Sequence, residues 1–533
     1  MDKADVIIIG GGLAGIVTAI ELLNKNKKII LIDRDIEENL GGQAKESFGG
    51  IFMVNSPIQK RMGIKDTTDL AFNDWCNFAE FSEADYWPKQ WARKYINESG
   101  GDLFNYFKKS SIKFFPVVHW VERGMYHPGN SVPRFHMVWG TGKELIDQHV
   151  NILLNHKNKQ NLKIYFSHHV QELIEEKNKI SSCRGTNTNS NIKFEFHADD
   201  VVLACGGVGT NLDIVKRNWN TDCFTAPDNL LIGCHKYADG ELHQTAQKLG
   251  ANITHLNKMW NYAAGIQHLT KPAPHGLSLV PTKSALWINA SGKRIGPMPL
   301  VTSYDTRFLV SEICKQEKQY SWQIMNKKIA LKELAVSGSE FNDAIRDKKI
   351  ISFLKSLLFG NKNLYESLKY KSDDFIIASS LEELVEKMNS LTDSEDVKIE
   401  NLRNDILDYD SQIDRGEKYF NDEQLRRIAH LRQYRGDRIR TCKFQKILDK
   451  DAFPLIAIRL KILVRKSLGG IQTDLDSRVL NSNNSPITGL YAVGEAAGFG
   501  GGGVHGKRAL EGTFLGSCII TAKAAAQAIT KEI

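Results

Sequence analysis

The sequence predicts an α/β protein in which one domain is assembled from distant parts of the chain and a second domain is inserted between them. Three short apolar runs carry this prediction: Val6–Ile9, Val201–Ala204 and Leu490–Val493, each followed within two residues by glycine. Continuous apolar runs of this length are typical of buried parallel strands. The glycines that follow the three runs mark three loops. If these loops bind one ligand, the strands before them belong to one sheet.

Composition places the chain among ordinary globular proteins. It has 533 residues, 42% hydrophobic and 25% charged, which excludes collagen-like, coiled-coil and disordered classes and suggests two to four domains. Eight cysteines occur without a C-x-x-C pair, so the sequence predicts reduced thiols and no structural zinc site. It shows no signal-peptide pattern and no apolar run near the roughly 20 residues of a membrane span. We therefore expect a cytoplasmic protein without a transmembrane segment.

The first strand opens a βαβ unit with a dinucleotide-binding pattern. Gly10, Gly12 and Gly15 form G-x-G-x-x-G, a helical pattern runs to about Asn24, and the next apolar run ends at Asp33. In this pattern the first glycine permits a tight turn, the second lets the backbone approach a pyrophosphate, and the third lets the helix pack on the sheet. The acid after the second strand accepts hydrogen bonds from ribose hydroxyls. The alternatives are a glycine-rich turn without a ligand and a plain surface acid.

A second glycine-rich segment follows the last predicted strand. Nine glycines fall within Gly494–Gly516, where average usage would give about two. Between the apolar runs at Val201–Ala204 and Leu490–Val493 the composition of the chain changes. Residues 256–437 hold charged helical patterns such as Asn342–Leu357. We therefore divide the chain into a first domain of residues 1–255 and 438–533 and a capping, substrate-binding domain of residues 256–437.

These blocks together resemble the fumarate reductase/succinate dehydrogenase flavoprotein superfamily, and within it the FAD-binding dehydrogenases related to 3-ketosteroid Δ1-dehydrogenases. The resemblance implies a discontinuous Rossmann-like FAD-binding domain with an inserted mixed α+β capping domain, and an active site between the two. The C-terminal block is its most specific part. The segments that carry it are Asp5–Asp33, Gly41–Ala44, Ser47–Gly50, Ala204–Gly207, Ala238–Gly240, Gly292–Arg294, Ser467–Gly470 and Gly489–Gly516.

The resemblance implies noncovalently bound FAD. Succinate dehydrogenases attach FAD through a histidine, and Gln43 stands at that position here. Asp239 and Glu495 have an alternative role as helix caps. By position, the cofactor-binding residues would be Gly10, Gly12, Leu13, Ala14, Gly15, Asp33, Arg34, Gly42, Gln43, Ser47, Gly49, Gly50, Val170, Ala204, Gly206, Asp239, Gly494, Glu495, Leu510 and Thr513.

The resemblance also implies where the chemistry lies. Ketosteroid dehydrogenases use a tyrosine as base, and Tyr304 follows the Gly-Lys-Arg element at roughly the corresponding distance. A nearby cation would lower the pKa of that phenol, and Lys466, Lys507 and Arg508 are the candidates. The alternative is a packed loop tyrosine. His136, in a Gly- and aromatic-rich stretch, and His505, among glycines, are further candidates for contact with flavin or substrate.

Three positions depart from the fumarate reductase pattern. Thr302 or its neighbours stand where the proton-donating arginine would be, Lys466 replaces a substrate-binding histidine, and Ala509 replaces a second arginine. We therefore expect FAD-dependent dehydrogenation, or the reverse reduction, of a CH–CH bond next to a carbonyl. The expected substrate is apolar or cyclic, with a 3-ketosteroid-like compound as one candidate, and the electron acceptor or donor is external. The alternatives are a reductase of a small unsaturated acid, favoured by Lys466 and Arg508, and a non-catalytic binding protein. No nucleic-acid partner is expected.

The positive charge is concentrated in one segment. Lys and Arg total 70 against 62 Asp and Glu, a net charge of +8. The segment from Leu425 to Lys466 holds 13 Lys and Arg, three Asp and no Glu, which is 13 − 3 = +10. We interpret it as a solvated face. The alternative is a guide for an anionic group, tested by replacing Arg435, Arg438 and Arg440 with glutamine.

Overall fold

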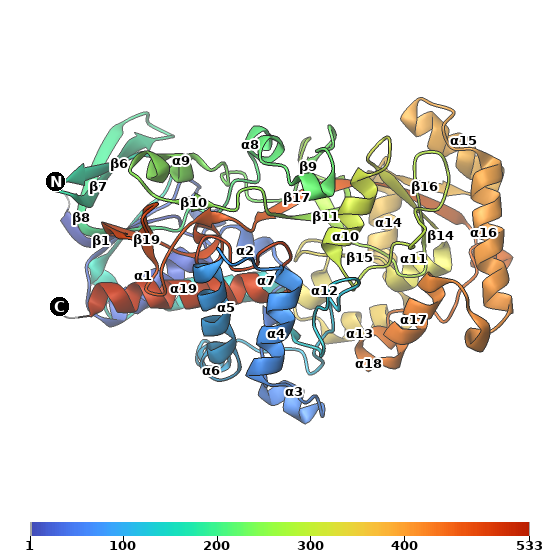
Figure 1. Cartoon of the computed structure of the whole chain (residues 1–533), viewed down its shortest axis with the longest axis horizontal. Helices are drawn as coiled ribbons and strands as arrows, with labels where there is room; N and C mark the ends of the chain where they lie inside the picture. The colour runs from blue at the N-terminus through green and yellow to red at the C-terminus, as the bar shows by residue number, and fades with distance from the viewer. Residues whose placement is uncertain (1–2, 532–533) are drawn as a thin grey trace. The chain divides into compact units, whose positions relative to one another are not determined.

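The computed structural model describes residues 3–531 and separates into two compact units (Figure 1). The first unit comprises the chain up to Asn218, Cys234–Trp260 and the chain from Arg465 onward. The second comprises Trp219–Gly233 and Asn261–Val464. Both mix helices and strands, and the first is discontinuous, as the sequence predicts.

The first unit is built on a mainly parallel sheet that contains all three predicted strands. Its main order is β19-β20-β8-β1-β2-β5, and β20, β8, β1, β2 and β5 pair in parallel. An antiparallel extension, β6 and β7, joins it at β8. The strands are β1 (Lys3–Ile9), β2 (Ile29–Ile32), β5 (Leu162–Tyr165), β6 (His168–Glu176), β7 (Lys179–Asn187), β8 (Lys193–Leu203), β19 (Arg478–Leu480) and β20 (Pro486–Ala492).

The register brings the three glycine loops to one edge of this sheet. Val201 of β8 is paired with Ile7 of β1 on one side and Leu490 of β20 on the other, and all three are fully buried. Because these strands are parallel, the glycines that follow them leave the sheet at the same carboxyl edge. The prediction of one sheet for the three runs is confirmed.

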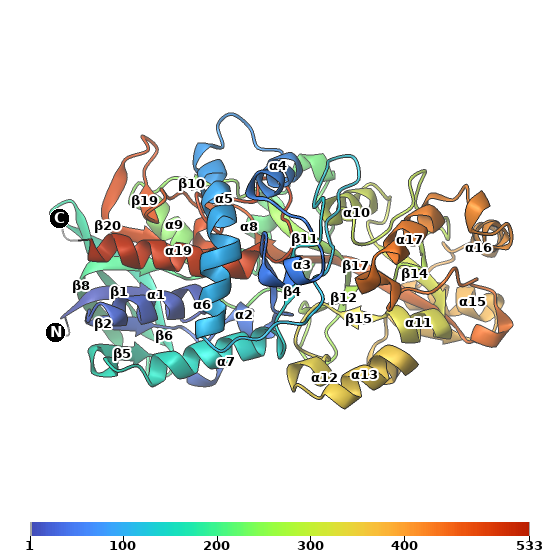
Figure 2. The same ribbon diagram turned by 90° about the horizontal axis from the view of Figure 1, so that it is seen from below.

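Both faces of the sheet are covered by apolar side chains that alternate along β1. Val6 and Ile8 belong to one core cluster, with α1 (Leu13–Asn24) and the C-terminal helix α19 (Thr513–Thr530). Ile7 and Ile9 belong to the opposite cluster, with α9 (Glu241–Lys248). Figure 2 shows α1 and α19 running beside each other along the sheet.

The aromatic-rich stretch after the first βαβ unit is helical and contributes side chains to the core. It folds into α4 (Thr68–Ala79) and α5 (Tyr86–Glu98). The side chains of Trp75, Trp91 and Tyr95 are at most 2% exposed.

The second unit contains another sheet, of mainly antiparallel strands, surrounded by helices. Its main order is β13-β14-β17-β11-β12-β15, with β9 and β16 paired to β17. The strands are β9 (Leu231–Ile232), β11 (Met259–Gln267), β12 (Gly276–Val280), β13 (Leu286–Ile288), β14 (Ser321–Asn326), β15 (Ala335–Val336), β16 (Phe375–Ala378) and β17 (Leu455–Ser467). Residues 438–464, which the sequence division places with the first domain, lie in this unit because β17 pairs with β14 and β16.

The helical pattern predicted over Asn342–Leu357 is two helices. These are α12 (Asp343–Arg346) and α13 (Ile350–Phe359). Lys348, between them, has a φ of 56°, in the left-handed region that a continuing helix does not use.

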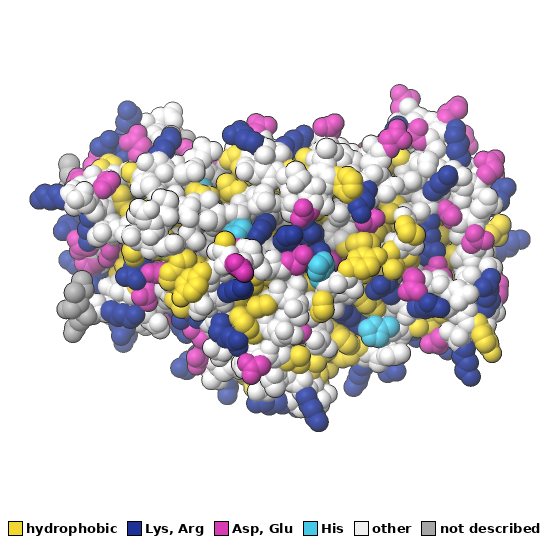
Figure 3. Space-filling view, in the orientation of Figure 1, with side chains coloured by type: hydrophobic (Ala, Val, Ile, Leu, Met, Phe, Trp, Pro, Cys, Tyr) yellow, Lys and Arg dark blue, Asp and Glu magenta, His cyan; other side chains and the backbone are white. Residues whose placement is uncertain are grey.

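The basic segment does not form a single uncompensated patch. Arg426 pairs with Glu423 at 2.7 Å, Lys446 with Asp414 at 2.5 Å, and Arg459 with Asp374 at 2.8 Å. These three acids lie outside the counted segment, so a window of sequence overstates the local charge. On the face drawn in Figure 3, basic and acidic side chains are interspersed.

Two further expectations concern the whole chain. All eight cysteines are free, as expected for thiols without disulfide partners. Among the described residues, no helix combines the length and the apolar character needed to span a membrane.

Candidate cofactor and active site

The first glycine loop has the steric properties that its pattern predicts. Gly10 has a φ of 113°, and a Cβ there would lie 2.3 Å from the carbonyl oxygen of Ala204. A Cβ at Gly15 would lie 1.9 Å from the carbonyl oxygen of Gly10. A Cβ at Gly12 would meet nothing within 4 Å, and Gly12 caps α1 without a side-chain hydrogen bond. The first turn of α1 therefore presents N–H groups to an open space, which suits a phosphate.

Two other glycines also face open space. A Cβ at Gly42 would have as nearest atom the Cα of Gly12, at 3.5 Å, and one at Gly206 would have Ala238 Cβ at 3.9 Å. The loops are tied together by the Gly41 N–H, which donates to Gly11 O at 2.9 Å. Backbone exposed in this way at three loops fits the extended diphosphate of FAD.

The acid after β2 holds the glycine loop. Asp33 Oδ2 accepts the Gly11 N–H at 2.6 Å, and Oδ1 accepts the Asp35 N–H at 2.7 Å. Burial raises the pKa of the Asp33 carboxyl. Its contact with a ribose stays a prediction, since each oxygen retains a further lone pair.

Asp239 makes two contacts within the protein. Its Oδ2 lies 2.6 Å from Arg34 Nη1, and its Oδ1 accepts the N–H of Glu241, the first residue of α9, at 3.1 Å. The cap position of α9 is occupied by Gly240, so Asp239, one residue earlier, is not the helix cap itself. Arg34 and Asp239, both predicted to bind the cofactor, are thus brought together by the fold.

Glu495 connects the middle and last glycine loops. Its Oε1 accepts the Ser467 N–H at 2.8 Å, and Ser467 Oγ accepts the Val208 N–H at 2.8 Å. A Cβ at Gly207 would lie 2.3 Å from the same Oε1, so a side chain there would have to displace the Glu495 carboxylate. Burial raises the pKa of Glu495 to about 7.

The remaining predicted cofactor residues also lie in the first unit, close in sequence to the strand and helix ends already described. Gln43 begins the short helix α2 (Gln43–Glu46), and β3 (Gly50–Phe52) follows it. The others are placed as follows: Leu13 and Ala14 in α1, Ser47 and Gly49 between α2 and β3, Gly50 in β3, Val170 in β6, Ala204 after β8, Gly494 after β20, and Leu510 and Thr513 at the start of α19.

His505 lies in an aromatic cluster in front of α19. Its ring is stacked on Trp75 with centroids 5.7 Å apart, and it contacts Phe514 edge-on at 4.8 Å. The side chain is fully buried, and its Nε2 has no hydrogen-bond partner among residues 3–531. Burial lowers the pKa of His505 to about 3, so the ring is neutral. A buried nitrogen of this kind is available to a ligand, which supports the predicted contact with flavin or substrate.

Lys466 and Glu511 lie near the same helix start. Lys466, at the end of β17, is half-buried, and its Nζ lies 3.8 Å from the centroid of the Phe514 ring. Burial lowers the pKa of Lys466 to about 8, against the opposing charge of Glu511. Glu511 Oε1 accepts the Trp260 Nε1–H at 2.6 Å. The cluster therefore contains an amine that can take up or release a proton close to neutral pH.

Glu511 is absent from the predicted site residues. The sequence does carry a signal, because Glu511 is the only acidic residue between Glu495 and Glu532. An acid within a glycine-rich loop beside the predicted flavin residues Leu510 and Thr513 is a site candidate on position alone.

Arg508 and Lys507, which are also predicted site residues, contact the end of α4. Arg508 forms an ion pair with Glu80, the residue that ends α4. Burial alone would raise the pKa of Glu80, but Arg508 lowers it. The Lys507 N–H donates to Ala79 O at 2.7 Å. The charge of Arg508 is therefore compensated within the protein.

His136 belongs to β4 (Phe135–Met137), which pairs with β3. Its Nε2 lies 2.7 Å from Ser56 Oγ and its Nδ1 lies 2.8 Å from Arg134 O. Burial lowers the pKa of His136 to about 4. With both ring nitrogens engaged, the geometry is that of a structural histidine, and its catalytic role stays a prediction.

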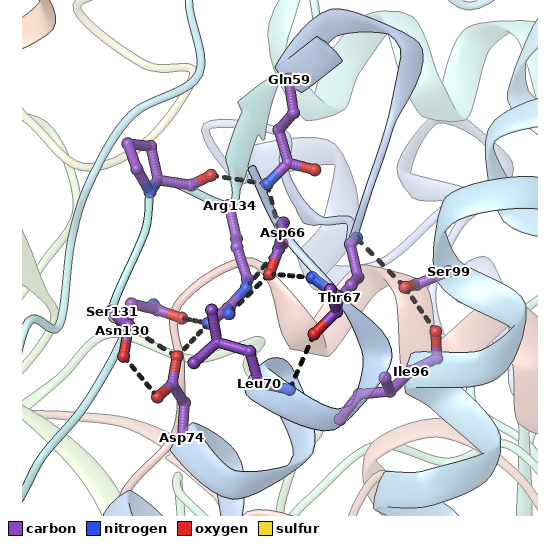
Figure 4. A network of polar contacts seen from close by, with 12 residues as sticks. Gln59, Asp66, Thr67, Leu70, Asp74, Ile96, Ser99, Asn130, Ser131 and Arg134 are labelled. Carbon is purple, nitrogen blue, oxygen red and sulfur yellow. Dashed lines mark hydrogen bonds and ion pairs between the residues drawn. The ribbon is translucent and has the colours of Figure 1, made fainter. Parts of the chain in front are cut away.

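A buried network supports these two strands (Figure 4). Arg134, directly before β4, is fully buried and binds Asp66 and Asp74. The Arg134 carbonyl accepts the Met53 N–H at 3.1 Å, and the Phe52 N–H donates to Gly512 O at 2.8 Å. The network thus fixes β3 and, through it, the residue that precedes α19.

Tyr304 lies in the second unit, where it is 4% exposed. Its hydroxyl lies 2.9 Å from His430 Nδ1, and the guanidinium of Arg427 lies 4.6 Å from its ring centroid. Arg427 is thus a cation beside this phenol that the sequence did not indicate. The assignment of Tyr304 as base stays a prediction.

The fold and the open glycine loops define the class of protein: a flavoprotein with a dinucleotide-binding unit. The FAD binding domain family matches residues 5–515, and the chain belongs to this family. It is an FAD-dependent oxidoreductase, and the predicted family resemblance is confirmed.

Named relatives and solved structures agree with this assignment. The chain is 41% identical over 550 residues to a KsdD-like steroid dehydrogenase of Mycobacterium tuberculosis, covering 99% of this chain and 96% of the relative. It is 38% identical over 536 residues to a KsdD-like steroid dehydrogenase of Mycolicibacterium smegmatis, covering 97% and 96%. The structure of 3-ketosteroid Δ1-dehydrogenase from Sterolibacterium denitrificans in complex with 1,4-androstadiene-3,17-dione superposes with a TM-score of 0.72 at 14% identity, covering 99% of both chains. An open flavocytochrome c3 fumarate reductase superposes with a TM-score of 0.70 at 18% identity, covering 99% and 78%. These two structures show the fold.

Proposed function

We propose that this chain binds FAD noncovalently and dehydrogenates a CH–CH bond next to the carbonyl of a steroid-like ketone, or catalyses the reverse reduction. The relatives named as steroid dehydrogenases support the substrate class. Gln43, which cannot take the place of a FAD-linking histidine, supports noncovalent binding. The observation that carries the proposal is the cluster of Lys466, Glu511 and His505 in front of α19.

The cluster provides a proton acceptor for such a reaction. Bound FAD would supply the acceptor for the hydride from one of the two carbons. The proton from the neighbouring carbon needs a base whose pKa is near the working pH. Lys466, with its pKa lowered to about 8 by burial, meets this requirement, and we propose it as the base with Tyr304 as the alternative. Glu511, held by Trp260, places a carboxylate near the amine that receives the proton.

Lys466 leads to a prediction about the pH dependence of the rate. Because the neutral amine is the base, kcat/KM is expected to rise as pH increases through about 8. This rise forms the acidic limb of the pH profile. In Lys466→Met the limb should disappear and kcat/KM should fall about 100-fold. The matched control is Lys523→Met, in α19 of the same unit, which should keep both rate and limb. A limb near the same pH in Lys466→Met would rule out this role.

The substrate class is tested by anaerobic bleaching of the oxidised flavin. A 3-ketosteroid is expected to bleach it, and acid precipitation is expected to leave FAD in the supernatant. Reduced enzyme that is reoxidised by fumarate and not by a steroid enone would instead favour the small-acid reductase. The ion pair of Arg508 with Glu80 argues against that alternative, because it neutralises a cation on which the alternative depends.

A further inference from the structure

Helix α13 of the second unit exposes large apolar side chains. None of its ten residues is buried, and Ile351, Leu354 and Leu358 are 68%, 51% and 78% exposed. Ile350 and Phe359, at its two ends, are 61% and 67% exposed. Figure 2 shows α12 and α13 at one edge of this unit. Contiguous apolar surface of this kind marks an interaction site, whereas scattered apolar residues do not.

The helix has an inner and an outer face. Phe353 and Leu357, four residues apart, are half-buried and face the unit, where α13 packs against α11 (Lys327–Glu333). Ile351, Leu354 and Leu358 follow the i, i+3, i+7 spacing of one helical stripe on the outer side. The fold therefore anchors α13 by one face and leaves the other apolar face to solvent.

Basic side chains surround this stripe. Lys348, Lys349, Lys355 and Lys362 are all exposed, and residues 348–362 contain no acid. The preceding acid, Asp347, lies 3.2 Å from Lys349 and also pairs with Arg346. The local surface therefore combines an apolar stripe with a net positive charge.

We propose that α13 binds in the plane of an anionic lipid membrane, with Ile351, Leu354 and Leu358 at the acyl boundary and the lysines at the headgroups. Interfacial helices use this combination of apolar stripe and lysines. With ten residues α13 is roughly 15 Å long, too short to span a bilayer, so it lies on the surface. Lysine is depleted at protein–protein interfaces, which favours lipid over a protein partner. The proposal is independent of the proposed reaction.

The test is co-sedimentation of the full-length flavoprotein with vesicles. Binding is expected to vesicles of phosphatidylcholine with phosphatidylglycerol and to be much weaker with phosphatidylcholine alone. Replacing Lys349, Lys355 and Lys362 with glutamine should weaken binding to the anionic vesicles about 100-fold, at roughly fivefold per lysine. Replacing Ile351, Leu354 and Leu358 with serine should weaken it at least about tenfold.

The control is Ile192→Ser, which removes a side chain that is 66% exposed in the first unit. It should bind vesicles like the wild type, and the flavin spectrum should be unchanged in every variant. Wild-type protein that does not sediment with anionic vesicles, or a triple serine variant that binds equally well, would overturn the proposal. So would a wild-type dimer that the serine variant converts to monomer without any vesicle binding, because α13 would then be a contact between copies.

Discussion

Replacing Arg134 with methionine is expected to destabilise the first unit by about 3–5 kcal/mol. Methionine keeps an unbranched apolar stem but lacks the guanidinium, so the change removes the buried positive charge together with its hydrogen bonds. The side chains of Arg134 and Asp66 are 0% exposed, and that of Asp74 is 2% exposed (Figure 4). Removing the cation leaves two carboxylates buried without a counter-charge, which costs far more than the net value of the ion pair.

The geometry of the network explains why arginine is required. Nε and Nη2 of Arg134 donate to the two oxygens of Asp66 at 2.9 and 2.8 Å, and Nη1 donates to Asp74 at 2.6 Å. Burial alone would lower the pKa of Arg134, but the two carboxylates raise it. A lysine cannot form the two-pronged contact, so Arg134→Lys should restore part of the stability only.

Two measurements separate lost charge from lost packing. Neutralising both acids in the triple variant Arg134→Met, Asp66→Asn, Asp74→Asn should recover much of the stability. The deficit of Arg134→Met should also shrink as pH falls from 7 to 5, because protonation neutralises the carboxylates and the folded variant binds those protons more strongly than the unfolded chain. The readout is the denaturant midpoint at which FAD is released. A deficit that is equal at both pH values and persists in the triple variant would indicate packing instead.

The parts of the fold that sequence could predict depend on local patterns. The strand at Ile29–Ile32 and the helix after Gly12 follow from short-range periodicity and from glycines with a fixed steric purpose. The common sheet follows from one added assumption, that three glycine loops serve one ligand. The break between α12 and α13 at Lys348 could not be predicted from local patterns, because the sequence on both sides of it has helical composition.

The partners of the site residues could not be predicted because they are distant in sequence. Arg508 pairs with Glu80, 428 positions away, and Tyr304 meets Arg427 and His430 more than 120 positions away. The charge of a side chain is determined by such partners and by burial. Candidate residues could therefore be named from motifs, whereas their protonation and availability needed the structure.

Gly12→Ala is expected to lower FAD affinity about 1,000-fold while leaving the apoprotein as stable as the wild type. The new Cβ meets no protein atom within 4 Å, and Gly12 has a φ of −73° and ψ of 179°, which alanine adopts readily. The methyl group would instead occupy the space through which a pyrophosphate approaches the N–H groups of α1. Losing two charge-assisted hydrogen bonds at about 1.5–3 kcal/mol each gives the expected reduction.

Two other glycines provide the comparison that makes this result interpretable. In Gly15→Ala the Cβ would lie 1.9 Å from Gly10 O, so both apoprotein stability and FAD affinity should fall. Gly101→Ala also meets no atom within 4 Å but is in the exposed segment after α5, so neither quantity should fall. Stability is measured on apoprotein, since bound FAD would itself stabilise the fold, and affinity by quenching of FAD fluorescence. If Gly12→Ala bound FAD normally, or lost stability like Gly15→Ala, the open space in front of Gly12 would not be the phosphate site, because only a ligand site is sensitive to a side chain that the protein itself tolerates.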